Sequence, residues 1–182
     1  GKHVAATAVA ECIKKNHPDR KLIVVCAYPE VFLNLPFVHR VYRIGNTPYF
    51  YDDYIDNKDF LMFKHEPYFT TDHLKKAMPL TQNWCKLYNL EYNGEKPSLI
   101  FNARQQEIAI NKWRRDKPII VMQTNGGPLQ DQPYPYSWTR DMPRQVGQDL
   151  VYKLMNDFHI IQICRNEGQF LDGAEHVNVP LS

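Results

Sequence analysis

Residues 124–138 include the side chains and glycines best suited to bind a phosphate-bearing ligand. The segment joins an apolar run at residues 119–122 to a helical pattern that begins near Val146. A connection between a parallel strand and a helix usually needs about two to six residues, so the greater length here indicates a functional loop. It follows the carboxyl end of a strand, the edge where open α/β sheets hold ligands. Its glycines let backbone amides approach an anion, and the next helix offers its positive end. We expect the phosphate contacts to come from Thr124, Asn125, Gly126 and Gly127, with Ser137 at the helix entrance. The alternative is a surface loop without a binding role, packed by its own prolines and tyrosines.

Lys2 and His3 form a second candidate site, at the mouth of the first expected helix. The pair Gly1-Lys2 is similar to the end of a phosphate-binding P-loop, but that motif requires Ser or Thr after the lysine, and here His3 follows. A helix-capping loop is the alternative.

The third candidate site lies in an aromatic insertion at residues 45–69. It contains Asp52, Asp53 and Asp56 among several tyrosines and phenylalanines. Aromatic rings stack on sugar C–H faces and carboxylates accept hydroxyl protons, a combination that suits a sugar acceptor. Packing of a large loop by its own tyrosines explains the same pattern. We expect no metal site, because no two histidines lie at helical spacing and the two adjacent aspartates are not a spaced ligand pair.

The overall composition favours a folded, soluble protein. The chain has 182 residues, of which 43% are hydrophobic and 23% charged, with a net charge of +2. This charge is too small for nucleic-acid binding by bulk electrostatics, and the longest apolar run is far shorter than a membrane span. The four cysteines form no Cys-x-x-Cys pair, so we expect buried, reduced thiols in a reducing compartment such as the cytoplasm. Because the chain starts at Gly1 without Met and stops without a terminating element, we expect a part of a longer protein.

The first elements that must position these residues alternate between helix and strand. Apolar residues recur at helical spacing from His3 onward, and an unbroken apolar run at residues 22–26 predicts a strand buried on both faces. A helix at residues 31–35, entered through Pro29, and a strand at residues 41–44 complete the α/β alternation.

The middle of the chain departs from this alternation and then returns to it. After the aromatic insertion, a helix capped by Thr71 is expected to kink or split at Pro79. A strand at residues 98–101 and a polar helix at residues 104–113 follow.

A new unit begins at Pro118. A buried strand at residues 119–122, a helical stripe from Val146 to Phe158 and a strand at residues 160–164 predict a βαβ unit. We place the domain boundary near residues 114–117.

The order of these features resembles glycosyltransferase family 9, the ADP-heptose:lipopolysaccharide heptosyltransferase-like enzymes. The likeness is carried by residues 1–8, 13–15, 17–25, 117–127 and 137–138, and it is weakest over residues 45–95. The resemblance implies a GT-B architecture of two Rossmann-like domains. Residues 1–116 would form the acceptor-side domain without its first strand, and residues 117–182 the incomplete start of the nucleotide-sugar-binding domain.

The resemblance also implies an activity. The family's enzymes transfer a heptose-like sugar from a nucleotide-sugar donor to a glycan or lipopolysaccharide-type acceptor, with inversion and without an essential metal or other cofactor. This implies a cytoplasmic protein whose partners are the nucleotide sugar and a glycan or lipid-linked acceptor, with peripheral membrane contact and no nucleic acid.

Two departures from the family pattern bear on catalysis. Family members usually have Gly-Asp where this chain has Gly1-Lys2, and that aspartate is the expected general base. A basic residue often stands where Tyr136 lies. Lys2 would then bind a phosphate, and His3, Asp52 or Asp53 would supply the base. The alternatives are a catalytically silent nucleotide-sugar-binding or assembly module of the same fold, and an unrelated flavodoxin-like ligand-binding domain.

Overall fold

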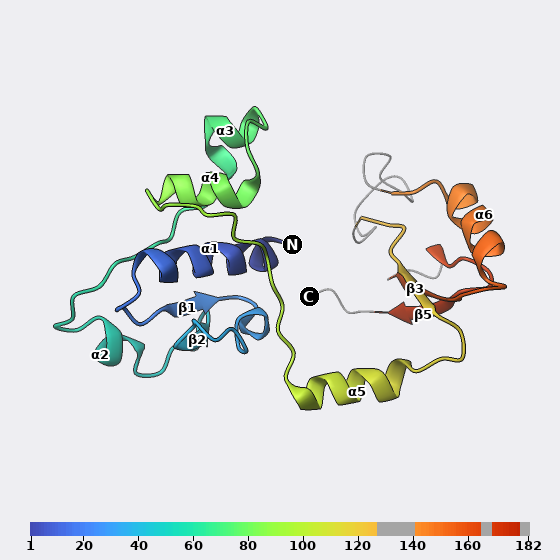
Figure 1. Ribbon diagram of the computed structural model, residues 1–182, viewed down its shortest axis with the longest axis horizontal. Coiled ribbons are helices and arrows are strands. Elements are labelled where there is room, and N and C mark those ends of the chain that lie inside the picture. Colours follow the sequence, from blue (N-terminus) through green and yellow to red (C-terminus); the bar gives the residue numbers. More distant parts are fainter. Residues whose placement is uncertain (127–140, 165–168, 179–182) are drawn as a thin grey trace. The chain divides into compact units, whose positions relative to one another are not determined.

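The computed structural model describes residues 1–126, 141–164 and 169–178, and it divides the chain into two compact units (Figure 1). Unit 1 comprises residues 1–107 and unit 2 comprises residues 108–182. The division falls within helix α5 (Ala103–Trp113), whereas the sequence places the boundary after residue 116. Each unit has helices and a parallel sheet, which confirms the mixed α/β class.

Helix α1 (Lys2–Asn16) is the central element of unit 1 (Figure 1). One side packs on strands β1 (Ile23–Cys26) and β2 (Arg40–Arg43), which pair in parallel. Its other side packs on helix α4 (Leu80–Leu87), where Val9 and Cys12 of α1 form a core cluster with Trp84 and Cys85. Apolar residues on both sides of α1 explain why the helix is buried between two layers.

The rest of unit 1 contains short helices joined by irregular segments. These are η1 (Pro29–Val31), α2 (Phe50–Tyr54), η2 (Pro67–Phe69) and α3 (Thr71–Leu74). The predicted break at Pro79 is confirmed, because α3 and α4 are separate helices and Pro79 is the N-cap residue of α4. The N-cap of α3 is Thr70 rather than Thr71, since the Thr70 hydroxyl accepts the His73 N–H at 3.2 Å.

Three expectations for unit 1 are wrong. Residues 98–101 form no strand, and Leu99, Ile100 and Phe101 are exposed, because no described strand lies in register to pair with them. Strand β1 is not buried on both faces, since Val25 keeps 40% of its surface exposed. The expected helix at residues 31–35 is the short 3-10 turn η1 followed by further turns.

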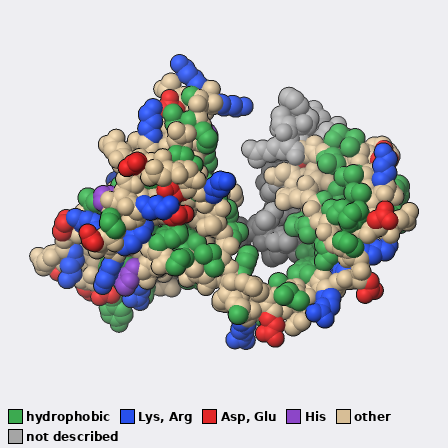
Figure 2. All heavy atoms as spheres, viewed as in Figure 1, with side chains coloured by type: hydrophobic (Ala, Val, Ile, Leu, Met, Phe, Trp, Pro, Cys, Tyr) green, Lys and Arg blue, Asp and Glu red, His purple; other side chains and the backbone are tan. Residues whose placement is uncertain are grey.

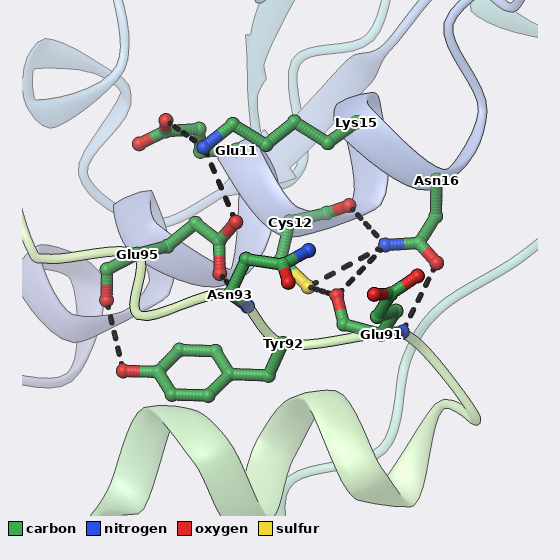
Figure 3. A network of polar contacts seen from close by, with 8 residues as sticks. All are labelled: Glu11, Cys12, Lys15, Asn16, Glu91, Tyr92, Asn93 and Glu95. Carbon is green, nitrogen blue, oxygen red and sulfur yellow. Dashed lines mark hydrogen bonds and ion pairs between the residues drawn. The ribbon is translucent and has the colours of Figure 1, made fainter.

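Hydrogen bonds fasten residues 91–95 to α1 (Figure 3). The side-chain amide of Asn16 donates to the carbonyl of Glu91 and its oxygen accepts the Glu91 N–H, each at 3.0 Å. The thiol of Cys12 also donates to the Glu91 carbonyl, at 3.2 Å.

The four cysteines are all free and buried, as the sequence predicts.

Unit 2 contains the predicted βαβ unit. Strand β3 (Ile119–Met122), helix α6 (Arg144–Leu154) and strand β4 (His159–Cys164) follow one another, and the two strands pair in parallel with Met122 opposite Gln162. A further strand, β5 (Glu175–Asn178), adds in parallel to β4. The sequence did not predict β5, because its polar residues lack the apolar run that identifies the other two strands.

The core of unit 2 lies between the sheet and α6, where Val151, Ile160 and Leu171 are buried together. Strand β3 is more exposed than predicted, with 59% of Val121 accessible. Other apolar side chains of this unit also reach its surface (Figure 2), among them Val146 of α6. Within the described ranges, every helix is too short or too polar to cross a bilayer.

Candidate functional site

Thr124 is buried and hydrogen-bonded just beyond the carboxyl end of β3. It is 94% buried, its hydroxyl donates to Oδ1 of Asn125 at 2.9 Å, and it accepts the Nε2 hydrogen of Gln162 at 3.0 Å. Gln162 is a fully buried residue of β4 whose amide also binds the Gln169 carbonyl and the Leu171 N–H, both at 2.9 Å. Because buried amides with every group bonded have few alternative positions, this network fixes the start of the candidate loop.

Helix α6 packs directly against this network. A Cβ built on Gly147 would lie 3.2 Å from Cδ1 of Leu171 and 3.6 Å from Cγ2 of Thr124. The absence of a side chain at Gly147 therefore lets the first turns of α6 approach the end of β3. This contact brings the amino-terminal half of α6 beside Thr124.

The backbone amide of Gly126 is already hydrogen-bonded. It donates to Oδ1 of Asp141 at 2.6 Å, and the Met142 N–H donates to the Thr124 carbonyl at 2.8 Å. The sequence predicts a phosphate contact for this amide, whereas in the structure it binds a carboxylate. Gly127 and Ser137, the other two expected phosphate contacts in this loop, lie outside the described residues.

The side-chain ammonium group of Lys2 forms an ion pair with the carboxylate of Glu66. Its Nζ lies 2.7 Å from Oε1 of Glu66, and this hydrogen bond raises the pKa of Lys2 above its ordinary value. Both side chains are more than 40% exposed, so the pair contributes little to stability. A lysine with a raised pKa stays protonated, so Lys2 is unsuited to act as a general base.

His3 is better suited to accept a proton. Burial and the neighbouring charge of Lys2 lower the pKa of the His3 imidazole below its ordinary value of 6.5. The ring lies edge-on to Tyr28, with centroids 4.9 Å apart, just after the carboxyl end of β1. His3 is therefore predominantly neutral at pH 7, the state in which imidazole accepts a proton.

Asp52 and Asp53 do not join Lys2 and His3. Both belong to α2, and Oδ2 of Asp53 lies 3.9 Å from Nη1 of Arg40, the first residue of β2. Since β1 and β2 are parallel and Arg40 lies opposite Ile23, Arg40 is at the amino end of the sheet, whereas Tyr28 follows its carboxyl end. The structure thus separates the two aspartates from Lys2 and His3 at the start of α1.

The aromatic insertion is partly packed and partly exposed. Phe50 and Tyr54 contact the ring of Tyr42 on β2, whereas Tyr49 and Tyr51 keep 74% and 63% of their surfaces exposed. The contacts of Phe50 and Tyr54 with Tyr42 agree with internal packing, and a sugar-acceptor site around Asp52, Asp53 and Asp56 stays a prediction. Across the described residues, no group of three or more His, Cys, Asp or Glu side chains is arranged to hold a metal ion.

Three residues of these sites were not predicted from the sequence. Gln162 could have been found, because it is the polar residue in the apolar run of β4 and such residues usually belong to buried networks. Asp141 and Glu66 carry no comparable signal, since their partners are distant in sequence and exposed acidic residues are common.

Comparison with known proteins adds no relative to this description. No protein-family model matches the chain, and neither the curated proteins nor the solved structures gave a match.

Proposed function

We propose that this chain is part of a GT-B-type glycosyltransferase. It transfers a heptose-like sugar from a nucleotide donor to a glycan or lipopolysaccharide-type acceptor, with inversion and without an essential metal. Unit 2 binds the donor through the loop that starts at Thr124, and unit 1 contributes to the acceptor side. The protein acts in the cytoplasm, in peripheral contact with a membrane that carries the acceptor.

The observation that carries this proposal is the rigid Thr124 network at the carboxyl edge of a parallel sheet. Ligands of open α/β sheets bind at this edge. The buried side chain of Gln162 donates two hydrogen bonds, to the Thr124 hydroxyl and to the Gln169 carbonyl, and these fix the positions of both residues. Preorganised donors and backbone positions are what a binding site requires from its supporting residues. The resemblance of residues 117–127 to the family's donor domain names the ligand class.

A specific observation favours the silent binding module as a second candidate function. Position 2, where the family's base is expected, holds an ammonium group paired with Glu66. If no other group takes the proton, the chain binds a nucleotide sugar without turnover. His3 is the neighbouring residue that would restore catalysis, because its lowered pKa leaves the imidazole uncharged at neutral pH, with one ring nitrogen able to accept a proton.

The first test is donor binding by the 182-residue chain. Calorimetric titration with nucleoside diphosphates and ADP-heptose is expected to show binding. Thr124→Val is expected to weaken it about tenfold, because the buried Gln162 amide and the side-chain oxygen of Asn125 lose their partner. Thr71→Val, at an exposed position on α3, is the matched control and should bind as the wild type does. Absence of binding to every nucleotide would contradict the proposal.

The second arm separates the enzyme from the silent module. His3→Gln is expected to abolish sugar transfer while donor affinity stays unchanged, because the substitution removes a proton acceptor from unit 1 only. Transfer is measured by mass spectrometry of a lipopolysaccharide-type acceptor. Donor binding with no transfer by the wild type would establish the silent module instead.

A further inference from the structure

The carboxylate of Asp141 occupies the position where a phosphate oxygen would meet the amide of Gly126. The distance from Gly126 N to Asp141 Oδ1 is 2.6 Å, at the short end for a hydrogen bond from nitrogen to a charged oxygen. Gly126 is exposed, so a ligand can reach this amide from solvent. An anion therefore already binds at the turn, and it belongs to the protein itself.

A second hydrogen bond fixes this arrangement. The Met142 N–H donates to the Thr124 carbonyl at 2.8 Å. Residues 141 and 142 are therefore attached to both ends of the turn formed by residues 124–126. Thr124 is in turn held by Gln162 of β4. The position of Asp141 over Gly126 thus follows from the same network that supports the candidate donor site.

A backbone N–H donates strongly to one acceptor at a time, so a phosphate oxygen can reach Gly126 only if the carboxylate leaves. A bound phosphate and the Asp141 carboxylate would also repel each other, because both are negatively charged and the repulsion grows as the two groups approach. We propose that Asp141 is an internal competitor for the donor phosphate, so that a nucleoside diphosphate binds only as this carboxylate moves off Gly126. This inference rests on the proposed function and adds the residue that sets donor affinity.

The test compares two substitutions that each remove one negative charge from unit 2. Asp141→Asn keeps an oxygen acceptor for Gly126 but removes its charge. Asp149→Asn, at an exposed position on α6 that accepts from Gln145, leaves the turn intact and is the matched control. In calorimetric titrations with ADP, GDP, CDP and UDP at low salt, Asp141→Asn is expected to bind on the order of tenfold more tightly than wild type, with Asp149→Asn unchanged. The gain should shrink at high salt, which screens exposed charges.

Equal or weaker binding by Asp141→Asn would overturn the inference, and so would an equal gain by Asp149→Asn, which would indicate a general charge effect. If Thr124→Val loses binding but Asp141→Asn gains none, the proposed function stands and the inference alone fails. If neither wild type nor variant binds any nucleotide, both fail.

Thermal unfolding verifies that each variant is folded. If Asp141→Asn is not, Asp141→Ser replaces it under the same criteria, because a hydroxyl oxygen also accepts from Gly126 without a negative charge.

Discussion

At the scale of single residues, Glu95 shows how unit 1 keeps a buried carboxylate ionised (Figure 3). Its side chain is fully removed from solvent, accepts the Asn93 N–H at 2.9 Å and lies 3.2 Å from Nζ of Lys15. Burial alone would raise the pKa of Glu95, but the backbone amides and Lys15 outweigh it and hold the pKa below its ordinary value of 4.5. The carboxylate therefore fastens residues 91–95 to α1 only while it is charged.

This predicts a stability loss at acid pH. A lowered folded-state pKa means that the contribution of Glu95 is present above pH 4.5 and is lost as pH falls through the folded-state value. Glu95→Gln is expected to lower the free energy of unfolding by about 1 kcal/mol at pH 7, and this loss should shrink as the pH falls below 4.5. Urea unfolding across this range measures the difference. Glu91→Gln, an exposed carboxamide substitution in the same segment, is the control, and a loss that persists unchanged at low pH would contradict the assignment.

At the scale of elements, α6 and residues 169–172 form the hydrogen-bonded support of the candidate donor site. Gln148 of α6 exchanges two hydrogen bonds with the backbone of Asp172, at 2.8 and 2.9 Å, and Arg144 donates to the Phe170 carbonyl at 3.1 Å. Gln162 attaches the same segment to β4. Helix, segment and strand are therefore joined by side-chain amides around Leu171, and the position of Thr124 depends on how closely α6 can approach.

Gly147 is the residue that permits this approach. Gly147→Val would place two methyl groups beyond a Cβ that already meets Leu171 at 3.2 Å and Thr124 at 3.6 Å. We expect the free energy of unfolding to fall by about 1–3 kcal/mol, because overpacking forces backbone shifts. Thermal unfolding and nucleotide titration measure the loss of stability and the accompanying loss of donor affinity.

Val146→Thr, at the exposed preceding position, is the matched control. A Gly147→Val protein as stable as the control would show that α6 has room to move.

At the scale of the whole molecule, the sequence predicts the helices and strands better than it predicts their pairing and tertiary contacts. The α/β alternation, the break at Pro79 and the βαβ unit follow from local patterns, because periodicity and proline act within a few residues. Residues 98–101 have the composition of a strand, but a strand also needs a hydrogen-bonded neighbour, which composition does not reveal. The same limit applies to the candidate site. Phosphate binding by Thr124 stays a prediction from its loop, whereas the carboxylate of Asp141 on Gly126 depends on a contact across fifteen positions.

The two units have separate cores, which predicts separate responses to core substitutions. Val151 is fully buried with Ile160 and Leu171 in unit 2, and Val9 is buried with Trp84 in unit 1. Val151→Ala removes two buried methyl groups and should cost about 2 kcal/mol. Because local opening follows local stability, hydrogen exchange should accelerate at residues 141–164 and 169–178 and stay unchanged at residues 1–107. Val9→Ala, the matched substitution in unit 1, should give the reverse pattern. Faster exchange in both units from either substitution would show that they unfold as one cooperative body, and the division into two units would then have no energetic counterpart.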